Sequence, residues 1–100
     1  MTVEDIEMNR EVRTVFARNW VNLQKLDYNC VHGTLYVRGR LTMLRPPPPR
    51  PGEDVDRAGV TASFLQHLER QLQKVSGLRG IRWQLDGWMR TTSNWTRSGL

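Results

Sequence analysis

His32-Gly-Thr-Leu-Tyr-Val-Arg-Gly-Arg-Leu-Thr-Met-Leu44 is the stretch of sequence that decides the fold. Side chains of an extended strand point alternately to its two faces. One face of this stretch is apolar and carries Leu35, Val37, Leu41 and Met43. The other is polar and carries Tyr36, Arg38, Arg40 and Thr42. The pattern predicts one half-buried strand, in which Gly39 marks a bulge or a close approach by a neighbouring element.

Two further strands are predicted on either side of this stretch in the sequence. Residues 27–31 suit a short strand, and the compact turn at His32-Gly33 would join it to the central strand as an antiparallel hairpin. Residues 78–85 alternate again, with Ile81, Trp83 and Leu85 opposite Arg82, Gln84 and Asp86. Trp88 and Met89 are expected to extend this third strand.

Two amphipathic helices accompany the strands. The first is predicted over about residues 3–23, with Thr2 as its cap, Asp5 as the capping-box carboxylate and Trp20 in the core. The second opens at Val60 or Thr61, ends at Gly77 and buries one stripe, while its polar residues, Glu69 among them, are expected to face solvent. The buried stripe consists of Phe64, Leu65, Leu68, Leu72 and Val75.

The order helix, strand, strand, helix, strand predicts a small α+β domain. Strands joined through a helix should be parallel, and two helices with one apolar stripe each can cover one face of a three-stranded mixed sheet. We therefore expect a single domain over residues 1–90 with a proline-rich loop at 45–59. Residues 91–100 are expected to form a flexible C-terminal tail.

The charge of the chain favours an anionic partner. Fifteen basic and ten acidic residues give a formal net charge of +5, and residues 28–52 hold four arginines and no acid. No window is apolar enough for a membrane span. The acidic N-terminus is unlike a secretory signal, which predicts a cytoplasmic chain as written, or a periplasmic one if it is a mature fragment. The sequence carries no signal for an oligomeric state.

Signatures of catalysis are sparse. His32 and His67 have no cysteine or carboxylate at ligand spacing, so a turn histidine and a surface histidine are favoured over a metal site. Cys30 is the only cysteine, and it is interpreted as a small buried hydrophobe. We predict no enzyme activity, no metal and no cofactor.

The solvent-facing side of the predicted sheet is the candidate binding surface. It brings together Tyr36, Arg38, Arg40 and Arg82, and an exposed Trp88 in the C-terminal segment is expected to assist. An arginine-bearing face that merely keeps a small sheet soluble is the alternative interpretation. A second alternative concerns residues 45–51, whose Pro-x-x-Pro core suits either an SH3-type groove or a stiff linker.

The spacing of glycines and apolar residues resembles that of a BON domain over about residues 12–86. The matching positions are Gly33-x-Leu35-x-Val37-x-Gly39-x-Leu41 and, after a helix, Val75-x-Gly77-Leu78-x-x-Ile81-x-Trp83-x-Leu85. Gly33, Gly39 and Gly77 correspond to the structural glycines of that family. The chain departs from it in its proline-rich loop, in Trp83 where the family often has Asn, and in a second helix poor in alanine.

The resemblance implies a noncatalytic module associated with membrane surfaces, envelope maintenance and protein attachment. Taken with the basic sheet face, it predicts docking to a partner protein or to an anionic membrane surface, including phospholipid. Binding of single-stranded nucleic acid through the same face is the rival prediction, with Tyr36 or a tryptophan stacking on bases.

Overall fold

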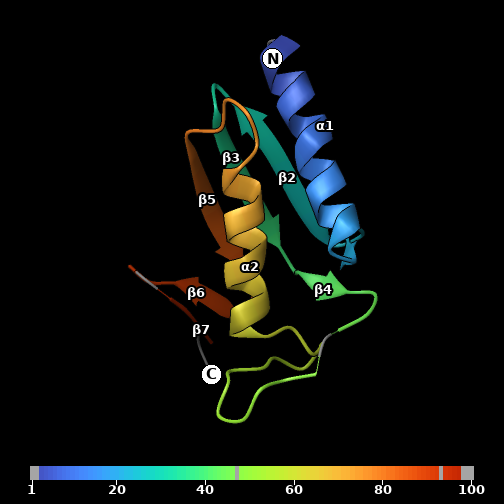
Figure 1. Ribbon diagram of the computed structural model, residues 1–100, viewed down its shortest axis with the longest axis vertical. Coiled ribbons are helices and arrows are strands. Elements are labelled where there is room, and N and C mark those ends of the chain that lie inside the picture. Colours follow the sequence, from blue (N-terminus) through green and yellow to red (C-terminus); the bar gives the residue numbers. More distant parts are fainter. Residues whose placement is uncertain (1–2, 47, 93, 98–100) are drawn as a thin grey trace.

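The computed structural model describes residues 3–46, 48–92 and 94–97. Two helices and seven strands follow one another along these residues (Figure 1). In chain order they are α1 (Val3–Arg18), β1 (Val21–Asn22), β2 (Leu26–Val31), β3 (Thr34–Gly39), β4 (Thr42–Met43), α2 (Ala62–Gln73), β5 (Gly80–Leu85), β6 (Trp88–Arg90) and β7 (Trp95–Arg97).

A three-stranded mixed sheet in the order β2-β3-β5 forms the centre of the molecule. β2 and β3 are antiparallel and meet at the turn His32-Gly33, whereas β3 and β5 are parallel and are connected through α2. Both helices lie on the same face of this sheet (Figure 1). The predicted α+β fold is therefore confirmed.

The predicted central strand is divided at Gly39. β3 ends there, and the following residues form β4, which pairs with β1 as a separate two-stranded ladder. Gly39 has a φ of +111°, and a Cβ built on it would lie 2.5 Å from the carbonyl oxygen of Lys25. The next residue, Arg40, donates its backbone N–H to the same oxygen at 2.9 Å. Gly39 is thus the predicted point of close approach, and only glycine fits it.

Helix α1 ends five residues earlier than predicted, and Trp20 is not in the core. Trp20 has a φ of +62° and is 48% exposed, with the Arg45 guanidinium 4.5 Å from its ring centroid. Pairing of β1 with β4 takes the chain out of the helix, so the tertiary contact overrides the helical spacing. The predicted cap Thr2 lies outside the described residues. Asp5 is buried instead of lying at the surface of the first turn.

Helix α2 begins as predicted. The Thr61 hydroxyl accepts the backbone N–H of Phe64 at 3.1 Å, which satisfies one of the free donors of the first turn. The helix ends at Gln73 with Lys74 as its cap, so Gly77, with a φ of +84°, follows the helix rather than terminating it. The core side of α2 carries Leu65, Leu68, Glu69 and Leu72.

The C-terminal segment is not a tail outside the domain. β6 and β7 form an antiparallel hairpin, and Trp88 and Trp95 are only 5% and 4% exposed. The predicted extension of the third strand is also wrong, because Gly87, with a φ of +83°, turns the chain between β5 and β6. The indole rings of Trp88 and Trp95 pack into the core and hold this otherwise polar segment against the domain. Residues 93 and 98–100, which the predicted tail included, lie outside the described residues.

The proline-rich loop is tied to the start of α2 by Glu53. Its carboxylate accepts the backbone N–H groups of Arg50 and Ser63 at 3.0 and 2.8 Å and also accepts the Ser63 hydroxyl. These hydrogen bonds, that of the Ser63 side chain first, lower the pKa of Glu53 to about 2. The described prolines at 46, 48, 49 and 51 remain exposed.

Replacing Gly39 tests the close approach of the Lys25 carbonyl oxygen to the end of β3. Gly39→Ala should lower the free energy of unfolding by more than about 2 kcal/mol, since the methyl group adds a clash to an unfavourable φ. Gly52→Ala is the matched control, because Gly52 has a φ of +77° with open space around it and loses only the conformational preference. Urea unfolding of both variants measures the difference. Equal losses would show that the contact with Lys25 is unimportant.

Glu53 should make stability depend on acid pH. The folded state holds the carboxylate ionised, so its contribution is fully present above the unfolded pKa of about 4.5 and is lost as pH falls through about 2. Glu53→Gln should therefore flatten the curve of thermal midpoint against pH across this window. An unchanged slope between wild type and variant would contradict the role assigned to Glu53.

Candidate functional site

The face of the sheet that turns away from the helices, here called the outer face, is the candidate site. The register aligns one row of side chains from Asn29 through Tyr36 to Arg82, and a second row from Asp27 through Arg38 to Gln84. Together these residues line a hollow of about 460 Å³. Three of the predicted binding residues, Tyr36, Arg38 and Arg82, are thus brought together.

Strand β2 adds an acid to the outer face that the sequence interpretation had left out. Asp27 lies opposite Arg38 in the register, and their side chains approach to 3.9 Å. The alternation of Leu26, Tyr28 and Cys30 with polar Asp27 and Asn29 is the sequence signal that places Asp27 there. The hollow is therefore lined by two arginines and one aspartate, which makes it less basic than predicted.

The ion pair between Arg38 and Asp27 leaves both groups available to a ligand. Their side chains are 72% and 81% exposed, and ion pairs in such surroundings contribute little to stability. Tyr36 is 50% exposed on the same face, where it lies opposite Arg82 in the register. The hollow thus offers guanidinium donors, a carboxylate acceptor and an aromatic surface within one small area.

Arg40 does not join the other predicted residues. It follows the break at Gly39 and lines a separate hollow of about 230 Å³ next to Asp56, Asp86 and Arg97. Arg57 also lines this second hollow, which therefore holds three arginines and two carboxylates. The prediction that Arg40 shares a binding surface with Arg38 is therefore wrong, because the strand alternation does not continue undisturbed through Gly39.

Trp88 is a structural residue rather than an exposed binding residue. Its indole Nε1 donates to Asp56 Oδ2 at 3.0 Å, and the guanidinium of Arg97 lies 5.8 Å from its ring centroid. Asp56 also accepts the backbone N–H of Val60, so this contact connects the C-terminal hairpin to the loop before α2. The predicted part of Trp88 in binding is thus corrected.

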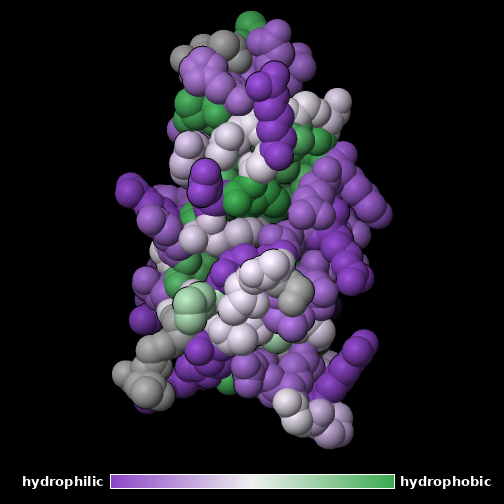
Figure 2. Space-filling model, turned by 90° about the vertical axis from the view of Figure 1, so that its left-hand side faces the viewer, coloured by the Kyte–Doolittle hydropathy of each residue, from purple (hydrophilic) through white to green (hydrophobic). Residues whose placement is uncertain are grey.

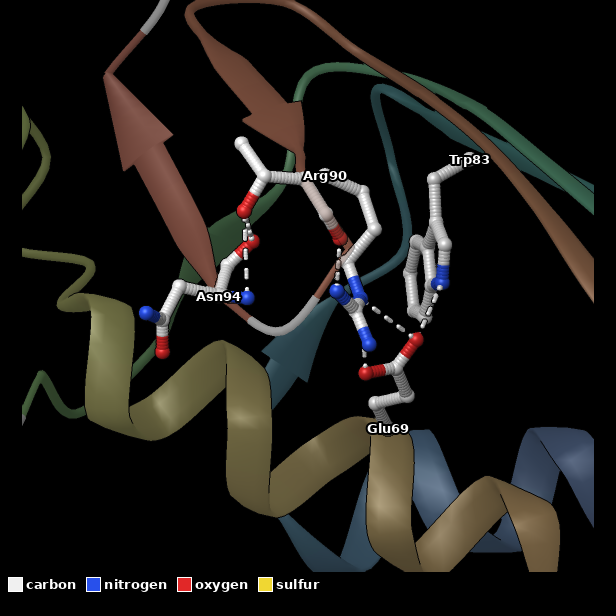
Figure 3. Close-up of polar contacts among 5 residues, drawn as sticks. Glu69, Trp83, Arg90 and Asn94 are labelled. Carbon is white, nitrogen blue, oxygen red and sulfur yellow. Dashed lines mark hydrogen bonds and ion pairs between the residues drawn. The ribbon is translucent and has the colours of Figure 1, made fainter.

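Glu69 was predicted at the helix surface, but it lies at the centre of a buried polar cluster (Figure 3). Its two carboxylate oxygens accept Arg90 Nε at 2.9 and 3.0 Å, and one of them accepts Trp83 Nε1 at 3.2 Å. The Trp83 ring packs edge-on against Trp95, with centroids 5.0 Å apart. Glu69 therefore connects α2, β5 and the β6–β7 hairpin through a single carboxylate.

The other potentially reactive side chains are those of Cys30 and the two histidines. Cys30 is buried in the core, where desolvation and the nearby Asp5 raise the pKa of its thiol, so it stays protonated. Both histidines are exposed. Within residues 3–46, 48–92 and 94–97 no group of three or more His, Cys, Asp or Glu side chains is arranged to hold a metal ion. None of the helices in that part of the chain has the length and apolarity needed to cross a bilayer.

No protein-family model, curated protein or solved structure matches this chain. The resemblance to the BON domain therefore stays a prediction that rests on the spacing of Gly33, Gly39, Gly77 and the apolar residues between them.

The ion pair between Glu69 and Arg90 should contribute to the free energy of unfolding. Arg90→Met should cost about 2 kcal/mol, because it leaves the Glu69 carboxylate buried without its cationic partner. Adding Glu69→Gln should recover roughly half of that loss, since the amide keeps an acceptor for Trp83 and removes the charge. Chemical denaturation of the two single variants and the double variant measures the coupling. Additive losses would mean that the pair does not act as a unit.

Proposed function

We propose that this chain is a noncatalytic interaction module that binds an acidic segment of a partner protein at the outer face of its sheet. The observation that carries the proposal is the position of Arg38 and Arg82 around the exposed ring of Tyr36 in one hollow. Guanidinium groups pair with carboxylates in a two-pronged geometry, and tyrosine and arginine are enriched at protein interfaces.

The mixed charge of the hollow favours a protein segment over a lipid surface or a nucleic acid. Asp27 lies beside Arg38, and its carboxylate would repel the phosphates of either polyanion. A protein segment can offer carboxylates to the arginines and an N–H or hydroxyl group to Asp27 at the same time. One outward aromatic, Tyr36, is a small surface for stacking successive bases.

The proposal is tested by removing the two arginines of the hollow. Arg38→Ala combined with Arg82→Ala should weaken binding to a fluorescein-labelled peptide of alternating Glu and Ser about tenfold, which corresponds to about 1.4 kcal/mol. Arg10→Ala with Arg13→Ala is the matched control, because it changes net charge equally at exposed positions on α1. Fluorescence anisotropy at fixed ionic strength measures both.

Three outcomes would contradict the proposal. Equal weakening in the two double variants would mean that net charge alone attracts the peptide. If the wild-type chain failed to bind the peptide, the proposal of an acidic partner would be wrong. Tighter binding to anionic vesicles or to single-stranded DNA, lost in the Arg38 and Arg82 variant, would replace the protein partner by lipid or by nucleic acid.

A further inference from the structure

The two edges of the central sheet differ in how they are protected. At the β2 edge, Asn9 of α1 accepts the backbone N–H of Cys30 at 2.9 Å and donates to the Asn29 side chain at 3.3 Å. The other edge is β5, and among the described residues no strand pairs with it on the side away from β3. In Figure 1 the β6–β7 hairpin lies below β5 and leaves its upper part uncovered.

Backbone groups along β5 face this free edge in a regular order. Just after β5, Asp86 donates its N–H toward β3, to the carbonyl oxygen of Gly39 at 2.8 Å. Backbone directions alternate along a strand, so Arg82 and Gln84 also point their N–H and C=O groups toward β3. Ile81 and Trp83 then direct theirs to the opposite side, where an added strand would find both donors and acceptors.

The side chains of β5 define what such a strand must look like. On the outer face Arg82 is exposed, as is Arg79 just before the strand. On the helix side Ile81 and Trp83 are only partly buried against the core, as is Leu78 before the strand. Figure 2 looks onto this side of the molecule, and hydrophobic residues reach the surface of its upper half between hydrophilic ones. The neighbour should therefore alternate acidic with apolar residues.

A second copy of the chain fits this edge poorly. Antiparallel pairing of β5 with itself would bring two copies of Arg82 opposite each other or into diagonally adjacent positions. Like charges at such positions of a sheet repel, and the two copies of Arg79 add to the positive charge. Charge complementarity selects an acidic segment instead.

We propose that β5 is the docking edge for an extended segment of a partner protein in which acidic and apolar residues alternate, and that this segment adds to the sheet as a fourth strand. The inference rests on the proposed partner-binding function and assigns the way in which the partner is held. Main-chain hydrogen bonds to Ile81 and Trp83 supply affinity, and the alternating side chains supply selectivity. Acidic residues of the added strand would lie beside Arg82, next to the hollow of the outer face.

Ile81 gives a test at the free edge. A proline is tolerated in an edge strand where its N–H would face away from the sheet. Ile81→Pro removes one donor from the free edge, whereas the matched control Ile81→Ala also loses the isoleucine side chain but retains the donor. The probe is a fluorescein-labelled peptide that alternates Glu with Val, compared with a peptide of the same composition in which the Glu residues form one block.

The alternating peptide should bind more tightly than the block peptide. Ile81→Pro should weaken this binding about fivefold or more relative to Ile81→Ala. Amide hydrogen exchange of the wild-type chain gives a second readout that needs no variant, since the bound peptide should slow exchange at Ile81 and Trp83.

Equal affinity for the two peptides, or equal affinity of the Ile81→Pro and Ile81→Ala variants with unchanged exchange at Ile81 and Trp83, would overturn the docking edge. In those cases, binding that still depends on Arg38 and Arg82 would leave the proposed function standing. If the wild-type chain bound neither peptide, the proposed function itself would fall together with the inference.

Discussion

The central position of β3 is the constraint on which the rest of the structure depends. It pairs with β2 on one side and with β5 on the other, and the second pairing is parallel. A parallel neighbour requires a crossover, so α2 must pass over the sheet and pack on the face that α1 also covers. The opposite face then has no covering element among the described residues (Figure 1). On that face the register sets Arg82 opposite Tyr36 and diagonal to Arg38.

Much of this arrangement was predictable because it follows from local periodicity. Alternating residues gave the three central strands, and Gly39 and Thr61 marked a close approach and a helix start that the structure confirms. What periodicity missed depends on contacts distant in sequence. Trp20 has helical spacing from Phe16, yet pairing of β1 with β4 ends the helix before it. The C-terminal hairpin closes through Trp95 packing on Trp83, which no local pattern reports.

The wrong prediction for Glu69 has a different cause, because the sequence itself indicates that this residue is buried. It lies four residues after Leu65 and three before Leu72, so it shares the buried side of α2 with them. A carboxylate at such a position needs partners, and Trp83 and Arg90 supply them. The rule that charged residues face solvent predicted Glu69 at the surface. Its helical spacing from Leu65 and Leu72 was the better indicator, because it predicts burial.

The positions of the charged side chains, rather than the net charge, determine what the outer face can bind. Several arginines that contribute to the formal charge of +5 are engaged within the molecule. Arg90 binds Glu69, Arg45 lies over Trp20, and Arg97 donates to backbone carbonyls of Gly87 and Val55. The positive groups available to a partner are therefore fewer than composition indicates, and on the outer face Asp27 offsets one of them. A surface of this kind discriminates by the placement of each charge, so selectivity for an ordered acidic pattern follows more naturally than general affinity for polyanions.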